Sequence, residues 1–410
     1  MRAIDSKQDD LATSGDAAHP GLRRGAARRE AAEGDRVLLF SFNYPPNDGG
    51  VSRLCAELVS GLQRRGVGIR VLSQRRDGVG SYLPLVPEER VAMRRPWREL
   101  AALRELRRTG ANAAVICGRW YPEGLLAALA GVRPIVILAH GLEIKPTREH
   151  WRRRIWLWLM QRVLDRAEVV VANSGYTAQL VRTMAPSARI AAVPLGVDHR
   201  RFCPGDRRSA RRSLAIPEDK HVILTVARIL AHKGHGLVLE ALASMPASVR
   251  ESFVYLVAGR GRDLEMLQKE ADALGLEGVV RWLGYVQEAD LPDLYRSADV
   301  FVLCSREDRD RPEVEGFGLA FLEAQACGTP VVGTRTGGIS DAVQDGRGGW
   351  LIEQDDAVAL AAILAHLVEA PGDFARMGRI ARQRVEQECT WNHYVDGFIE
   401  ALDRRAVALR

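Results

Sequence analysis

The feature that most constrains the fold of this chain is a repeated alternation of short apolar runs with helical stretches. The first half contains the runs "RVLLFSFN", "IRVLS", "AAVIC", "PIVILAHG", "VVVANS" and "IAAVPLG". Between the first two lies "VSRLCAELVSGLQRRG", in which apolar side chains recur at helical spacing and Gly66 ends the pattern. Buried apolar strands that alternate with helices predict a parallel sheet with helices on both faces.

A second series of the same kind follows "GVDHRRFCPGD", with strands predicted at "HVILTVARI", "FVYLVAGRG", "VVRWLG", "DVFVLCS", "PVVGT" and "GWLI". A chain of 410 residues is long enough for two domains. We therefore predict an α/β protein with two doubly wound, Rossmann-like domains that face each other across a cleft. The predicted parts are a disordered tail (1–34), an N-terminal domain (35–197), a C-terminal domain (204–388) and a final helix (389–410) that packs back towards the N-terminal domain.

The net charge and the cysteine content of the chain limit which ligands and which cellular compartment it suits. Six basic and six acidic residues balance within the tail, so the net charge of +6 belongs to the folded part. This excess suits a nucleotide, a phosphorylated lipid or an anionic membrane surface, and no nucleic-acid module is recognisable. The six cysteines show no Cys-x-x-Cys spacing, and neither a signal peptide nor an apolar run of about 20 residues is present. We expect a cytoplasmic protein with reduced thiols.

Two loops at the ends of predicted strands suit a diphosphate. Gly49 and Gly50 directly precede a helix, where backbone N–H groups and the helix dipole attract anions. Arg228 and Lys233 flank the loop after the first strand of the second series, and together they offer a forked and a point-like cation. Taken singly, an ordinary turn and two solvated cations explain these residues equally well or better.

Three weaker patterns favour structural explanations. Gly259-x-Gly261 lacks the third glycine of a dinucleotide fingerprint, so a strand-to-helix turn is the better interpretation. His232 and His235 have no third metal ligand nearby in the sequence. Asp308-Arg309-Asp310 has a spacing that could hold a divalent metal, but it lies in a highly charged stretch that favours a solvated loop.

The segment "EGFGLAFLE" places Glu315 and Glu323 eight residues apart at the start of a predicted helix. Leu319, Leu322 and Ala326 give this helix a buried face, and Gly328 and Pro330 end it. If both acids were helical, they would share a face at a separation of roughly 12 Å. That separation is too long for an acid–base pair on one bond. It suits two acceptors that hold distant hydroxyls of one long ligand.

At this point the sequence resembles a known family. "EGFGLAFLEAQACGTPVVGTRTGG" is similar to the E-x7-E signature of family 4 retaining glycosyltransferases of the GT-B fold. The segments "PPNDGG", "AHG", "PLGVD", "VARILAHKG", "VAGRG", "LGYV" and "SADVFVLCS" occur in the order typical of the family. The resemblance extends from Arg36 to about Trp391, and it implies an enzyme that uses a nucleotide-sugar donor.

The resemblance implies a donor site shared between two groups of residues. Gly49 and Gly50 would approach the donor diphosphate through their backbone, and Arg228 and Lys233 would clamp it and stabilise the leaving nucleotide. Glu323 would accept hydrogen bonds from the ribose hydroxyls.

Further residues would hold the sugar and the base. Glu315, with the backbone amides of Phe317, Gly318 and Leu319, would hold the transferred sugar. His140 would contact the sugar near the reacting carbon, and the backbone around Tyr285-Val286 would hold the base.

The family implies transfer with retention and without a bound metal or other cofactor. One departure concerns Gly337-Gly338-Ile339-Ser340-Asp341, where relatives often have Gly-Gly-x-Pro-Glu. The segment "FLEAQACG" resembles the sequences of mannosyltransferases that act on phosphatidylinositol mannosides. GDP-mannose is therefore the first hypothesis for the donor. The acceptor would be a glycan, a glycolipid or another lipid-linked acceptor. The alternatives are another GT-B enzyme, such as a nucleotide-sugar epimerase or phosphorylase, and a non-catalytic nucleotide-sugar-binding protein.

The first half of the chain, which would bind the acceptor, has clusters of arginines beside Trp97, Trp151, Trp156 and Trp158. A basic amphipathic surface of this kind can bind an anionic membrane, which would place the protein peripherally at the inner face of the cytoplasmic membrane. Packing of the tryptophans into the core, with solvated arginines, is the competing interpretation.

Overall fold

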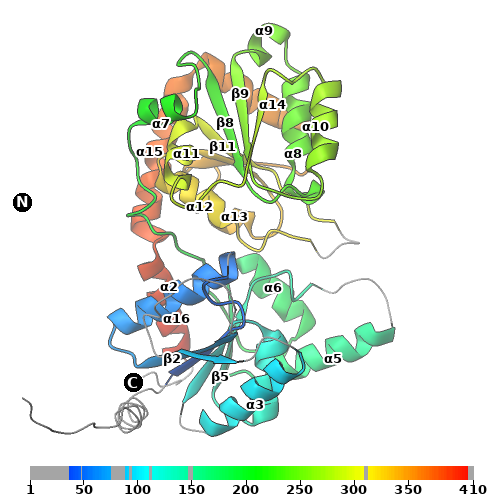
Figure 1. Ribbon diagram of the computed structural model, residues 1–410, viewed down its shortest axis with the longest axis vertical. Helices are drawn as coiled ribbons and strands as arrows, with labels where there is room; N and C mark the ends of the chain where they lie inside the picture. The colour runs from blue at the N-terminus through cyan, green and yellow to red at the C-terminus, as the bar shows by residue number, and fades with distance from the viewer. Residues whose placement is uncertain are drawn as a thin grey trace, which may run out of the picture. The chain divides into compact units, whose positions relative to one another are not determined.

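The computed structural model describes residues 37–47, 49–74, 95–109, 113–145, 151–308 and 313–404, and the backbone of 88–91 (Figure 1). The tail predicted at 1–34 and Asp310 lie outside the described residues, as do the side chains of residues 151–153. The prediction of an α/β fold with two doubly wound sheets is confirmed by the two sheets described next.

The first sheet is parallel throughout and has seven strands in the order β3-β2-β1-β4-β5-β6-β7. Its strands are β1 (Val37–Phe40), β2 (Ile69–Gln74), β3 (Glu88–Val91), β4 (Ala114–Cys117), β5 (Ile135–Ala139), β6 (Val169–Ala172) and β7 (Ile190–Ala192). The sequence analysis did not predict β3. We call this sheet and its helices the N-terminal lobe.

The helices of the N-terminal lobe follow the strands as the alternation predicts. They are α2 (Gly50–Arg64), α3 (Trp97–Thr109), the π-helical turn η2 (Trp120–Gly124), α4 (Leu125–Ala130), α5 (Trp151–Arg166) and α6 (Gly175–Met184). Because successive side chains of a strand point to opposite faces, Leu39 packs into the core on the face covered by α2, while Leu38 and Phe40 enter the core beneath α3 and α5.

The second sheet is also parallel, with six strands in the order β10-β9-β8-β11-β12-β13. Its strands are β8 (His221–Val226), β9 (Phe253–Ala258), β10 (Val280–Gly284), β11 (Val300–Leu303), β12 (Val331–Thr334) and β13 (Gly349–Ile352). In both lobes the strand order reverses beside the first strand, next to β1 and β8. Ligands of open parallel sheets bind outside the carboxyl ends of the strands at this position.

The helices of this C-terminal lobe alternate with its strands along the chain. They are α7 (Arg207–Ser213), the 3-10 turn η3 (Ala231–Lys233), α8 (His235–Ala243), α9 (Ala247–Arg250), α10 (Leu264–Ala273), α11 (Leu291–Ser297), α12 (Leu319–Ala326), α13 (Ile339–Ala342), α14 (Ala357–Glu369) and α15 (Pro371–Glu388). Within the described residues no single helix is long and apolar enough to cross a bilayer, although the bent pair α14 and α15 meets that criterion when taken together.

The chain returns from the C-terminal lobe to the N-terminal lobe through its last helix, α16 (Trp391–Asp403). Its N-cap residue Thr390 forms a β-bridge with Val197, in the connection between the lobes. The helix then packs against α2 and β6 of the N-terminal lobe. The domain boundaries given above stay predictions.

Candidate active site

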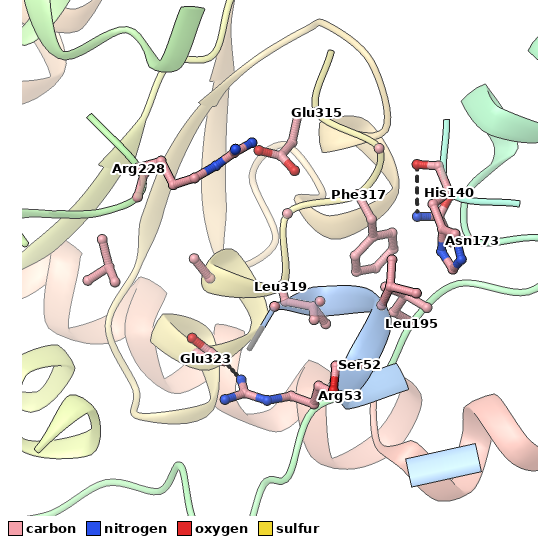
Figure 2. A pocket seen from close by; sticks show the side chains of 18 of the residues that line it. Ser52, Arg53, His140, Asn173, Leu195, Arg228, Glu315, Phe317, Leu319 and Glu323 are labelled. Atoms are coloured by element: carbon pink, nitrogen blue, oxygen red, sulfur yellow. Dashed lines mark hydrogen bonds and ion pairs between the residues drawn. The ribbon is translucent and has the colours of Figure 1, made fainter. Parts of the chain in front are cut away.

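A pocket of about 810 Å³ lies between the two lobes. Its walls come from the loop before α2, the ends of β5, β6 and β8, and the loop that leads into α12 (Figure 2). Ten of the residues singled out from the sequence line it: Gly49, Gly50, His140, Arg228, Lys233, Glu315, Phe317, Gly318, Leu319 and Glu323. The structure thus brings residues that are up to 274 positions apart (from 49 to 323) into one site.

The N-terminus of α2 opens onto this pocket. Gly49 has φ of 115°, a left-handed conformation that favours glycine, and among the residues that the structure describes no side chain caps the helix. Ser52, in the first turn, is buried and lines the pocket, yet its hydroxyl has no hydrogen-bond partner among the described residues. Unpaired backbone N–H groups, the helix dipole and a free hydroxyl together suit an anionic ligand group.

The two predicted cations lie on the opposite side of the pocket. Arg228 follows β8, and its side chain extends towards the Glu315 carboxylate in Figure 2. Lys233 Nζ donates to Glu315 Oε2 at 2.5 Å, and the two side chains are only 11% and 17% exposed. In the structure, therefore, the lysine and the acid form a partly buried ion pair.

The loop that carries Glu315 is not helical. Helix α12 begins only at Leu319, so the separation of roughly 12 Å that assumed two helical acids does not apply. The Glu315 carbonyl accepts from the Gly338 amide at 2.8 Å, which fixes the loop. A Cβ atom at Gly316 would clash with the His140 carbonyl oxygen, so this glycine allows the two lobes to approach each other here.

His140 directly follows β5 and is held in one orientation. Its Nε2 donates to the Gly118 carbonyl at 2.7 Å, because a carbonyl can only accept, and its backbone N donates to Glu143 Oε1 at 2.6 Å. Burial lowers the pKa of His140, against the electrostatic effect of Glu143, which raises it. The ring is consequently neutral at pH 7 and presents Nδ1 as an acceptor.

Glu323 lies at the inner end of the pocket and is 6% exposed. Its Oε2 accepts from the Tyr295 hydroxyl at 2.8 Å, and its Oε1 forms an ion pair with Arg53. Burial raises the pKa of Glu323, while Arg53 and the Tyr295 hydrogen bond lower it. The sequence analysis had assigned this acid alone, without either partner.

Of the residues assigned to the base, Val286 does not line the pocket, and Tyr285 is about half exposed next to it in sequence. The pocket also contains polar residues that the sequence analysis missed, namely Arg53, Ser52, Glu288 and Asn173. Ser52 and Arg53 lie two and three residues after Gly50 of the recognised "PPNDGG", so their position was a usable signal. Glu288 and Asn173 follow strand ends without any recognisable motif.

The residues with a competing metal interpretation have other partners. The Asp308 carbonyl accepts from Lys145 at 2.8 Å, and Glu307 beside it accepts from Tyr176 at 2.5 Å, so this segment contacts the N-terminal lobe. His235 is buried between the Tyr255 hydroxyl and the Arg228 carbonyl. In the part of the chain that the structure describes, no three His, Cys, Asp or Glu side chains are placed to hold a metal ion.

The departure from the family pattern at Asp341 also lies between the lobes. Its Oδ1 accepts from the Gly175 backbone N–H at 2.9 Å, at the start of α6. An acid at a helix N-terminus satisfies a free donor and complements the helix dipole. Here the acid and the helix belong to different lobes, so Asp341 helps to join them beside the pocket.

Comparison with known proteins gives consistent matches over both lobes. Residues 48–201 match the family Glycosyltransferase Family 4, and residues 206–384 match Glycosyl transferases group 1. A D-inositol 3-phosphate glycosyltransferase of Geodermatophilus obscurus is 33% identical over 391 residues, which cover 83% of this chain and 85% of that protein. Further D-inositol 3-phosphate glycosyltransferases align over only about half of their length.

A GDP-mannose-dependent alpha-(1-6)-phosphatidylinositol monomannoside mannosyltransferase of Mycolicibacterium smegmatis is 29% identical over 373 residues, covering 87% of this chain and 95% of that protein. Among solved structures, Anabaena HepE in complex with UDP and glucose superimposes with a TM-score of 0.73 at 20% identity, over 90% of this chain and 99% of HepE. The architecture common to these structures is the GT-B fold, and the two lobes and the pocket between them follow it.

Proposed function

We propose, since this chain belongs to the family 4 glycosyltransferases, that it transfers a hexose with retention from a nucleotide-sugar donor to a hydroxyl of an anionic acceptor. The observation that carries this proposal is the single pocket that joins the N-terminus of α2 to Arg228, Lys233 and Glu315. Such a pocket offers N–H donors and cations for a diphosphate, and a carboxylate beside them that can accept from sugar hydroxyls.

The proposed reaction needs no more than these groups. The acceptor oxygen bonds to the anomeric carbon on the face from which the diphosphate leaves, the bond from that carbon to the phosphate oxygen breaks, and the acceptor proton passes to the departing phosphate. Arg228 and Lys233 neutralise the charge that develops on the leaving group, which lowers the barrier without a metal ion. Glu315 holds the sugar hydroxyls, and neutral His140 accepts from the sugar through Nδ1.

GDP-mannose is the proposed donor. Its support is the similarity to a GDP-mannose-dependent mannosyltransferase along most of the chain. The base would lie near Tyr285, whose ring is half exposed and lies 5.6 Å from the Arg260 guanidinium. An aromatic ring beside a guanidinium offers surfaces on which a purine can stack.

For the acceptor we propose a phosphorylated polyol, free or as a lipid headgroup. Two of the relatives described above act, by name, on inositol 3-phosphate or a phosphatidylinositol mannoside.

A membrane surface is the proposed partner for a lipid-linked acceptor. Trp97 is 67% exposed on α3 and Trp158 is 56% exposed on α5, so the packed-core interpretation fails for these two tryptophans. Trp156, in contrast, packs one face against Trp120 and Tyr121. Exposed Leu100 and Ile155 share these helices, and α5 also carries arginines. This surface would seat the protein peripherally, at the cytoplasmic face of the membrane.

The proposal is tested by a donor panel. The purified protein is incubated with GDP-mannose, GDP-glucose, UDP-glucose, UDP-galactose and UDP-N-acetylglucosamine, and both thermal stabilisation and release of the nucleoside diphosphate are measured. We expect GDP-mannose to stabilise the protein and to be hydrolysed slowly, and Glu315→Gln to abolish hydrolysis. Inositol phosphate should accelerate turnover of the donor. Failure of every nucleotide sugar to bind would overturn the proposal.

Membrane contact is tested separately by sedimentation with vesicles that contain anionic lipid. We expect the protein to pellet at low salt and the double substitution Trp97→Ala and Trp158→Ala to reduce pelleting. A protein that stays in the supernatant at every salt concentration would exclude the membrane part of the proposal without affecting the donor part.

A further inference from the structure

The two oxygens of Glu323 are held by partners from different lobes. The Tyr295 hydroxyl, on α11 of the C-terminal lobe, donates to Oε2 at 2.8 Å. The Arg53 guanidinium, in the first turn of α2 of the N-terminal lobe, pairs with Oε1 through Nη1 (Figure 2). Tyr295 is fully buried and Arg53 is 25% exposed. One oxygen of Glu323 is therefore held by its own lobe and the other by the opposite lobe.

Arg53 is itself fixed by a second acid. Its Nη2 lies 2.6 Å from Glu288 Oε1, and Glu288 Oε2 lies 2.9 Å from Arg201 Nη1. The fork of the Arg53 guanidinium thus spans two carboxylates of the C-terminal lobe. A planar, forked group with two fixed contacts has little freedom to turn away from Glu323.

The contact leaves Glu323 able to bind a ligand. Each carboxylate oxygen has two lone pairs, and Arg53 and Tyr295 together use one on each oxygen. One lone pair remains on each oxygen, and Glu323 lines the pocket. Two neighbouring acceptors match a pair of vicinal hydroxyls, such as those of a ribose.

The charge of Glu323 depends on the same arginine. Burial raises the pKa of this carboxyl, and Arg53 is the largest of the influences that lower it. The other titratable groups that act on the carboxyl or are affected by it are Glu288, Tyr295 and Cys327. A carboxyl that carries a proton has lost one acceptor and gained a donor, so it no longer offers two acceptors to the hydroxyls.

We propose that Arg53 is a positioning residue that makes Glu323 a two-acceptor site for the ribose hydroxyls of the donor only while the lobes are closed. Arg53 belongs to one lobe and Glu323 to the other, so separation of the lobes removes the arginine from the acid. Recognition of the ribose is then coupled to closure of the cleft. The inference rests on the proposed function, in which the pocket binds a nucleotide sugar.

The test compares binding of GDP with binding of 2′,3′-dideoxy-GDP by calorimetry, because the ratio of the two dissociation constants isolates the hydroxyl contacts. In the wild-type protein we expect GDP to bind about tenfold or more tightly than the dideoxy compound. In Arg53→Gln we expect the ratio to fall to about threefold or less, and Arg53→Lys should recover part of it. Arg201→Gln is the matched control, since Arg201 also pairs with Glu288 but does not touch Glu323.

The pH dependence separates positioning from a merely structural effect. Loss of Arg53 raises the pKa of Glu323 further, so in Arg53→Gln the preference for GDP should decline at a higher pH than in the wild type as the pH is lowered from 8 to 6. A structural defect would weaken both ligands equally and leave the ratio unchanged.

The binding measurements test three statements separately: the role of Arg53, the assignment of Glu323 to the ribose, and the proposed function. An unchanged ratio in Arg53→Gln, or tighter GDP binding by that variant, would overturn the role of Arg53, and the second result would identify the arginine as a competitor of the ribose. If the wild-type protein binds neither GDP nor UDP, the proposed function fails instead. If it binds GDP without any preference over the dideoxy compound, the assignment of Glu323 fails while the transferase proposal stands.

Discussion

Replacement of Lys233 by methionine tests both the ion pair between Lys233 and Glu315 and the proposed role of Lys233 in transfer. Methionine keeps most of the unbranched stem of lysine and removes the charge. In the structure Lys233 Nζ lies 2.5 Å from Glu315 Oε2, with side chains 11% and 17% exposed. Removing one partner of a buried pair costs roughly 3–5 kcal/mol because the other charge is left uncompensated. Both groups are open to the pocket, so we expect about 2–3 kcal/mol of lost stability.

The effect on transfer should be larger than the effect on folding. Lys233 is proposed to face the leaving diphosphate, and loss of one preorganised group that stabilises developing charge lowers kcat by about 10² to 10³. The double variant Lys233→Met, Glu315→Gln removes both charges of the pair. It should therefore recover most of the thermal stability, whereas transfer should stay lost.

The measurements are thermal unfolding of the ligand-free protein and release of nucleoside diphosphate under single-turnover conditions. Lys269→Met is the control, because Lys269 pairs with Glu265 at the exposed surface, where such pairs contribute little. The reasoning about the ion pair is wrong if the double variant is no more stable than Lys233→Met. The catalytic role of Lys233 is refuted if kcat of Lys233→Met stays within about threefold of the wild type.

Three further predictions concern packing, lobe contact and pH. Phe321→Ala should lower stability by about 3–5 kcal/mol in thermal unfolding, because the ring is fully buried 5.4 Å from Phe301. Gly316→Ala should abolish transfer while near-UV circular dichroism stays close to that of the wild type, because the new methyl clashes with the His140 carbonyl and separates the lobes. Burial lowers the pKa of His235 to about 4, so the unfolded state binds a proton that the folded state excludes, and stability should fall as the pH drops from about 6.5 to 4. His235→Gln should flatten that decline in urea unfolding at several pH values.

Most of the fold could be predicted because the central strands of both sheets are buried on both faces. Runs such as Val37–Phe40 and Phe253–Ala258 are entirely apolar and entirely buried, and composition alone identifies them. Strand β3, Glu88–Val91, could not be found in this way. It is an edge strand of mainly charged residues, and its pairing with β2 through the backbone leaves no apolar pattern in the sequence.

The site was predictable where its residues follow strand ends, because parallel strands deliver their carboxyl ends to one edge of the sheet. That reasoning identified Gly49, Gly50, Arg228 and Lys233, which line one pocket, whereas His140 in the same pocket was assigned from the family resemblance. It could not supply the partners of the acids. Arg53 and Glu323 are 270 positions apart, and only the closed arrangement of the lobes brings them together.

The pairing of charges in the pocket bears on how the proposed donor would be recognised. Lys233 is paired with Glu315 and Arg53 is paired with Glu323, so each of these two acids already has a cationic partner. Under the proposed function, we expect a donor diphosphate to draw Lys233 towards its own negative charge, so that Glu315 would then accept from the hydroxyls of the sugar. A sugar without a hydroxyl at that place leaves a partly buried carboxylate unpaired, which is costly. We therefore expect the protein to select a donor whose diphosphate replaces Glu315 as the partner of Lys233 and whose hydroxyls replace Lys233 as the partner of Glu315.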